Sequence, residues 1–221
     1  MSKGIYISSA EPGSGKSVVV LGIMEMLAGQ GGRTGFFRPV VRYGEKPDNI
    51  TNLIIRRYGL KTPYAMLYGC TYEVARDMLI KDKDDDLLKL IMEKYKTLEG
   101  ECDLIVCAGS DFTGPAAALE FDFNAKIANN LGCPMLPVVK GYGKNAMQVV
   151  TAAQGLLKSL EERQCDLLAL VANRVQPALV EEVSEGLKKA MPAGIPAYVL
   201  AELPVLEKPT VGEIAATLGA E

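Results

Sequence analysis

Short, continuous apolar runs alternate along the chain with longer stretches in which apolar residues recur every three or four positions. The continuous runs at 4–8, 35–41, 103–107, 134–140, 167–172 and 197–203 are typical of buried parallel strands. Helical spacing predicts helices over 16–28, 48–58, 71–80, 84–98, 124–131, 144–163, 179–191 and 210–218. Between 41 and 103 we find no convincing central strand. The alternation predicts one α/β domain over 1–221, a doubly wound, mostly parallel sheet of about six or seven strands flanked by helices.

The turn between the first strand and the first helix has the sequence of a phosphate-binding loop. It ends in Gly13, Ser14, Gly15, Lys16 and Ser17, and the helix of 16–28 follows at once. Backbone N–H groups at such a turn and helix start attract anions, and the motif's lysine and hydroxyl serve the terminal phosphates and Mg²⁺. The usual motif has a glycine where this chain has an alanine at position 10, so a glycine-rich turn with an exposed, solvated lysine is the alternative.

The first helix is apolar nearly all round, which predicts that it is buried on every side. Arg38 precedes a proline near the end of the second strand, at the sheet edge where open α/β folds bind ligands, and we expect it to contact an anion. Asn173 and Arg174 follow the fifth strand at the corresponding edge. Either of them could instead serve the loop conformation alone.

Three acidic positions have both a metal-binding and a structural interpretation. Asp48 is a candidate metal ligand and also a candidate N-cap of the helix over 48–58. Asp111 follows the third strand and could ligate a metal or close an Asx turn. The acidic cluster at 82–86 is better explained as a helix start, where carboxylates offset the helix dipole.

Composition excludes several classes of function. The 221 residues carry a net charge of −3, which argues against a nucleic-acid partner. No apolar run is long enough to span a membrane, and the start lacks a signal-peptide pattern, so we expect a cytoplasmic protein with no membrane partner. The 5 cysteines have no close pairing, as expected for reduced thiols. The absence of histidine excludes a histidine-based nucleophile system or metal site within this chain.

Six segments, in this order, carry a resemblance to a known family. They are the loop at 10–17, Phe37-Arg38-Pro39, the glycine-rich segment at 109–114, the segment at 123–134, Asn173-Arg174-Val175, and Leu203-Pro204 with the segment at 209–211. Over its full length the chain resembles the N-terminal domain of long-form phosphate acetyltransferases, which is itself similar to dethiobiotin synthetase.

The resemblance implies a P-loop fold and a longer protein. In that family a C-terminal domain transfers acetyl between coenzyme A and phosphate, and the N-terminal domain is thought to regulate activity and assembly in response to metabolites. The resemblance therefore implies a nucleotide or a small anionic metabolite as ligand, the C-terminal acetyltransferase domain as partner, and a homo-oligomer.

Similarity to dethiobiotin synthetase implies roles for individual residues. Lys16 and Ser17 match the groups that bind ATP and Mg²⁺, and Asp48 matches a further carboxylate. Arg38 stands where the synthetase has a lysine that holds the carbamate, and Asn173 matches an asparagine that reads adenine.

The third strand ends in Ala108, where the synthetase and many relatives have a glutamate that holds or orients the cation. Asp111 is the nearest substitute. The sequence thus favours a regulatory domain that binds ATP, or another nucleotide, and Mg²⁺ without efficient turnover. The alternatives are an ATP- and Mg²⁺-dependent ligase of the dethiobiotin synthetase type, and a structural module whose loop binds nothing.

Overall fold

Seven parallel strands form one sheet in the computed structural model, which describes residues 3–9, 11–110 and 117–207. In spatial order the strands are β3-β2-β4-β1-β5-β6-β7. Their bounds are Gly4–Ser9 (β1), Thr34–Val41 (β2), Tyr68–Thr71 (β3), Leu104–Ala108 (β4), Met135–Lys140 (β5), Leu170–Val175 (β6) and Ala197–Ala201 (β7). Every pairing is parallel, so the predicted doubly wound α/β sheet is confirmed.

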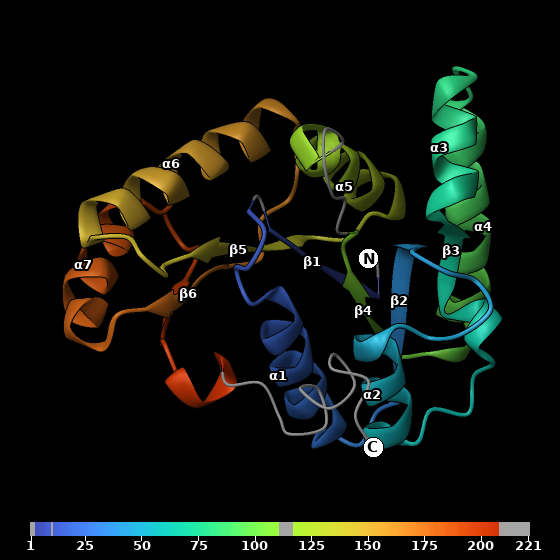
Figure 1. The fold of residues 1–221 in the computed structure, drawn as a ribbon, viewed down its shortest axis with the longest axis horizontal. Coiled ribbons are helices and arrows are strands. Elements are labelled where there is room, and N and C mark those ends of the chain that lie inside the picture. Colours follow the sequence, from blue (N-terminus) through green and yellow to red (C-terminus); the bar gives the residue numbers. More distant parts are fainter. Residues whose placement is uncertain (1–2, 10, 111–116, 208–221) are drawn as a thin grey trace, which may run out of the picture.

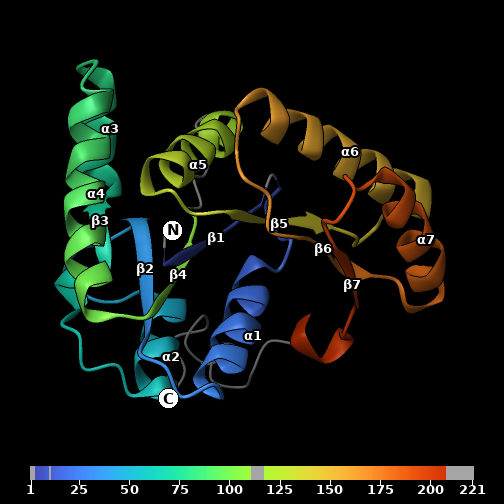
Figure 2. The same ribbon diagram turned by 180° about the vertical axis from the view of Figure 1, so that it is seen from behind.

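Helices cover both faces of this sheet (Figures 1 and 2). They are Lys16–Ala28 (α1), Asn49–Tyr58 (α2), Tyr72–Ile80 (α3), Asp84–Glu101 (α4), Ala117–Leu131 (α5), Ala146–Glu162 (α6) and Val180–Ala190 (α7). Short 3₁₀ turns span Tyr64–Met66, Pro177–Leu179 and Pro204–Glu207. The helices α1 and α2 pack on one face of the sheet, and α3 to α7 contribute to the core of the other.

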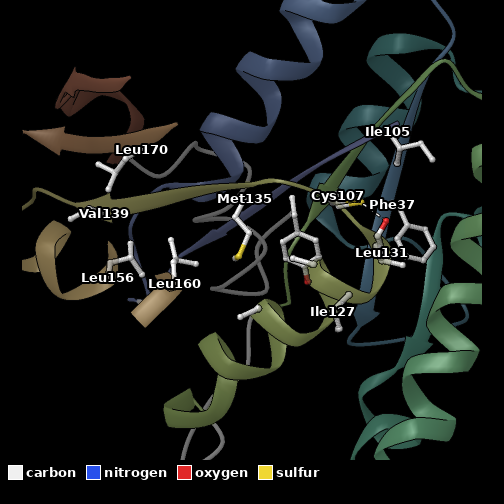
Figure 3. Packing of buried hydrophobic residues seen from close by; sticks show 14 of the residues in the cluster. Phe37, Ile105, Cys107, Ile127, Leu131, Met135, Val139, Leu156, Leu160 and Leu170 are labelled. Atoms are coloured by element: carbon white, nitrogen blue, oxygen red, sulfur yellow. Dashed lines mark hydrogen bonds between the residues drawn. The ribbon is translucent and has the colours of Figure 1, made fainter. Parts of the chain in front are cut away.

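The larger core lies between the sheet and the helices α3 to α7. Figure 3 shows Ile127 and Leu131 of α5 beside Phe37 and Cys107 of the central strands. Burial raises the pKa of the Cys107 thiol well above its ordinary value, as expected for a core thiol. The smaller core, on the other face, holds Ile7 and the inward side of α1.

Local capping chemistry fixes where several helices begin. Asp48 accepts a hydrogen bond from the backbone N–H of Thr51 at the start of α2, and Thr71 does the same for Val74 at the start of α3. Three aspartates occupy the first turn of α4, as predicted from the acidic cluster. None of the helices in the described parts of the chain is long and apolar enough to cross a membrane.

Some elements differ from the prediction. The edge strand β3 was not predicted, because four residues that include a glycine give no apolar run. The strand β6 begins and ends later than predicted, so that Asn173 and Arg174 lie within it. The prediction of a fully buried α1 was wrong: Val18 is 47% exposed and Met26 65% exposed, since one side of this helix is not covered by the described residues. The helix predicted over 210–218 lies outside the described residues.

Candidate functional site: the phosphate loop and its neighbours

The turn that joins β1 to α1 has the backbone geometry that the loop sequence predicts. Gly13 and Gly15 have positive φ angles of 72° and 77°, which glycine adopts without strain. Gly15 is the N-cap of α1, so no N-cap side chain bonds the N–H groups of the first turn. A Cβ on Gly15 would lie 2.3 Å from the Asn173 amide nitrogen. The loop therefore needs glycine at this position for both its conformation and its packing.

Lys16 is buried, which contradicts the alternative of an exposed, solvated lysine. It is only 6% exposed, and its Nζ donates to the carbonyl oxygens of Gly109 at 2.6 Å and Ser110 at 3.3 Å. Both carbonyls lie just beyond the end of β4. The ammonium is thus held at the carboxyl edge of the sheet, next to the turn. The following residue, Ser17, is exposed on the first turn of α1.

Two consecutive residues of β6 hold the outer side of the loop. Asn173 Nδ2 donates to the carbonyl of Ser14 at 2.9 Å, and Arg174 Nη1 donates to the carbonyl of Gly13 at 3.1 Å. The structure therefore brings Asn173 and Arg174 to the phosphate loop, where their bonds serve the loop conformation, and a nucleotide-binding role for them stays a prediction.

Arg174 reaches the loop because the strand is irregular there. Its φ is 61°, and the pairing of β6 with β7 shifts between Ala172 and Val175. Its Nη2 is 3.0 Å from Glu202 Oε1, and its guanidinium lies 4.4 Å from the centre of the Tyr142 ring. The sequence contained no signal for these contacts with Glu202 and Tyr142.

A cavity of about 420 Å³ opens beside the loop. Its lining is mostly apolar and includes Gly15, Val18, Asn173, Arg174, Leu200 and Leu203. The exposed side of α1 supplies Val18, so this wall depends on the part of the helix that was expected to be buried. An apolar cavity with a few polar groups next to an anion-binding loop suits a ligand with a flat ring and a charged tail.

Arg38 and Asp48 form an ion pair with an N–O distance of 2.5 Å. The Arg38 side chain is 11% exposed. The other Asp48 oxygen accepts the backbone N–H of Thr51, so both carboxylate oxygens have protein partners. Partial burial, and then the nearby Asp48 charge, raise the pKa of the Tyr64 hydroxyl to about 12. The metal role of Asp48 and the anion role of Arg38 stay predictions.

Two predicted features of the site fall on parts of the chain that are not described. Asp111, the third metal candidate, and the alanine at position 10 both lie outside the described residues. Ala108 ends β4 with its methyl group buried against the smaller core. Within the described residues there is no group of three or more acidic or cysteine side chains that could hold a metal ion.

The chain matches a known protein family over nearly its whole length. A family described as "AAA domain" (AAA_26) matches residues 3–211. The chain belongs to this family. Two curated relatives are phosphate acetyltransferases, one from Nitratidesulfovibrio vulgaris, 37% identical over 227 residues, and one from Synechocystis, 32% identical over 191 residues.

These relatives are much longer than the present chain. The first match covers 100% of this chain but 32% of the relative, and the second covers 86% and 27%. The resemblance to the P-loop domain of phosphate acetyltransferases is therefore confirmed, and the chain spans about a third of the relatives' length.

Solved structures confirm the P-loop NTPase fold. A plasmid partition protein from Borrelia burgdorferi bound to AMPPNP matches with a TM-score of 0.56 and 17% identity, covering 99% of this chain and 97% of that one. The Cyanothece McdA–ATP complex matches with a TM-score of 0.52 and 10% identity, covering 100% and 98%. At these identities the likeness concerns the fold alone.

Proposed function

We propose that this AAA-family domain binds ATP, or another nucleotide, and Mg²⁺, and that it regulates the activity or assembly of a phosphate acetyltransferase. The observation that carries the proposal is the juxtaposition of the Lys16 loop with the apolar cavity lined by Val18 and Asn173. A triphosphate would lie on the loop, where the helix start and the ammonium both attract negative charge. The base would enter the cavity.

The contacts of Asn173 support this placement. One of its amide hydrogens holds the Ser14 carbonyl, and its side chain also lines the cavity. A carboxamide offers two donors and an acceptor, so it can hold the loop and hydrogen-bond a base edge at the same time. The analogous solved structures with AMPPNP and ATP bound are consistent with a nucleotide as the ligand class.

The chemistry of the site favours binding over turnover. In the proposed complex the Ser17 hydroxyl would help to hold Mg²⁺, which would offset the negative charge of the phosphates. The end of β4 offers the methyl group of Ala108 where a carboxylate would hold or orient the cation. We therefore expect slow hydrolysis or none.

The wider role follows from the length of the relatives. Since this chain covers about a third of the phosphate acetyltransferases it matches, we assign acetyl transfer from acetyl-CoA to phosphate to the remaining part of such a protein. Binding of the nucleotide, or of a small anionic metabolite at the same loop, would then change the activity of that C-terminal acetyltransferase domain. The proposal includes the homo-oligomer and the cytoplasmic location predicted from the sequence.

Calorimetric titration of ATP, with and without Mg²⁺, tests the site directly. We expect saturable, sub-millimolar binding to the natural chain. The variant Lys16→Gln keeps a donor for the Gly109 carbonyl but loses the charge, so ATP affinity should fall at least about tenfold, or about 1.4 kcal/mol. Lys158→Gln makes the same charge change on the exposed face of α6 and is the matched control.

Two other results would change the interpretation. Equal ATP affinity in the natural chain and in Lys16→Gln would show that the loop is not the binding site. Rapid release of orthophosphate that depends on Lys16 would favour a ligase of the dethiobiotin synthetase type over a regulatory domain.

A further inference from the structure

A buried chain of hydrogen bonds joins helix α5 to the phosphate loop through the end of β4. The Tyr6 hydroxyl donates to Asn124 Oδ1 at 2.7 Å, and the backbone N–H of Ser110 donates to the same oxygen at 2.9 Å. Asn124 Nδ2 in turn donates to the carbonyl of Ser110 at 3.3 Å. One amide side chain therefore pairs with both main-chain groups of Ser110.

The main chain that Asn124 holds is the one that receives Lys16. The Ser110 carbonyl accepts from Asn124 and from Lys16 Nζ, and the neighbouring Gly109 carbonyl accepts the shorter Lys16 bond of 2.6 Å. Gly109 is closely surrounded. Its N–H donates to the carbonyl of Ile7, and a Cβ added to Gly109 would lie 2.7 Å from Asn124 Oδ1. These two carbonyls, which accept from the ammonium, are thus fixed by neighbours.

The polar groups of this network are buried, which costs free energy unless they are hydrogen-bonded. Tyr6 and Asn124 are both 0% exposed, and Ser110 is 2% exposed. Burying an amide and a phenol is unfavourable unless their hydrogen bonds are made, and a satisfied buried network is rigid. Apolar side chains of similar size would fill the same space, so packing alone does not account for an asparagine at position 124.

We propose that Tyr6 and Asn124 are positioning residues of the phosphate site. They fix the carbonyls of Gly109 and Ser110, and these carbonyls give the Lys16 ammonium a defined direction at the loop. The affinity of the loop for phosphate then depends on helix α5 and on the face of β1 that carries Tyr6. Both lie on the side of the sheet opposite to α1. This inference rests on the proposed nucleotide-binding function.

The variant Tyr6→Phe removes one hydroxyl from the network and preserves the shape of the core. We expect its ATP affinity to be about fivefold weaker than that of the natural chain, as for the loss of one buried hydrogen bond. Tyr95→Phe is the matched control: Tyr95 is also 0% exposed, and its hydroxyl contacts Cys133 Sγ at 3.4 Å. It packs beside Gly4, at the end of β1 away from the loop. It should lose stability but keep ATP affinity.

A second measurement needs no nucleotide. The side-chain ammonium of Lys16, followed by NMR in the unliganded protein, should exchange its protons slowly in the natural chain and in Tyr95→Phe, and faster in Tyr6→Phe. A purely structural role for Tyr6 would lower the melting temperature without this local effect.

The outcomes separate the inference from the function on which it rests. If the natural chain binds ATP and Tyr6→Phe matches it in affinity and in ammonium exchange, the positioning role is overturned and the proposed function stands. If the natural chain binds no ATP, the proposed function fails, and the affinity arm of the inference fails with it. Equal weakening by Tyr6→Phe and Tyr95→Phe would also overturn the inference, since it would indicate general loss of packing.

Discussion

At the scale of single residues, the phosphate loop is held by partners that are distant in sequence. Lys16 bonds a carbonyl 93 positions away, and Asn173 bonds one 159 positions away. The motif sequence predicted which residues form the loop, because its geometry is local. It could not predict that Lys16 is buried, because the carbonyls that accept its hydrogen bonds lie just beyond the end of another strand, β4.

The contact between Asn173 and Ser14 gives a prediction at this scale. Asn173→Asp replaces the donor by an oxygen 2.9 Å from a carbonyl oxygen, so the loop loses a bond and gains a repulsion. We expect a loss of about 1–3 kcal/mol in unfolding free energy, together with weaker ATP binding. Chemical denaturation and calorimetry would measure the two effects.

Asn130→Asp is the control for this change. Asn130 is exposed on α5, and its amide also donates to a backbone carbonyl, that of Lys126, at 2.8 Å. Because water can solvate both groups, Asn130→Asp should lose less than about 1 kcal/mol of unfolding free energy, and its ATP binding should not change. Similar losses of unfolding free energy in both variants would mean that the buried Asn173 hydrogen bond contributes no more to stability than the exposed Asn130 one.

At the scale of elements, the sequence predicted the starts of the capped helices α2 and α3 better than the limits of β6, whereas α5 begins at Ala117 and not at the predicted position 124. Helices α2 and α3 begin beside Asp48 and Thr71, because a cap is a contact between residues three positions apart. The limits of β6 depend on its pairing with β5 and β7 and on the left-handed backbone of Arg174. The exposed side of α1 could not be predicted either, since exposure depends on which elements lie beside it.

The start of α2 gives a prediction at the element scale. Asp48→Ala removes both the helix cap and one ion-pair partner of Arg38, whose side chain is 11% exposed, so we expect a loss of about 3 kcal/mol in unfolding free energy. Asp48→Asn keeps an oxygen for the Thr51 N–H and should lose less. Urea denaturation would measure both.

Thr71→Ala is the control for capping alone, because Thr71 caps α3 through its hydroxyl. Its expected cost is about 1 kcal/mol. If Asp48→Ala costs no more than Thr71→Ala, the ion pair with Arg38 contributes nothing to stability.

At the scale of the whole molecule, an ion pair at the amino edge of the sheet links two neighbouring strands. Arg33, just before β2, makes two side-chain hydrogen bonds and one backbone hydrogen bond to Asp103, just before β4. The Arg33 side-chain bonds, followed by its backbone N–H, lower the pKa of the Asp103 carboxyl to about 2. The ionised carboxylate is therefore favoured in the folded state.

A carboxyl with a lowered pKa in the folded state stabilises the protein above its unfolded pKa of about 4 and loses that contribution as pH falls toward about 2. We expect Asp103→Asn to flatten the decline of the denaturation midpoint over this pH range. The effect should be modest, because both side chains are exposed and screened by salt. Asp77→Asn, beside Arg76 at 3.8 Å, should leave the profile unchanged. Matching profiles for the two variants would contradict the assigned role of Arg33.

The strand order also governs when the phosphate loop can form during protein synthesis. The strand β1 is made before the other strands of the sheet, yet its partners are β4, where Gly4 aligns with Ile105, and β5, where Tyr6 aligns with Met135. At about 5–20 residues per second, the wait for both neighbours is on the order of ten seconds. During that time the apolar first strand has neither partner, which leaves it prone to aggregation. The phosphate loop between β1 and α1 thus gains its neighbours late, after most of the domain has been made.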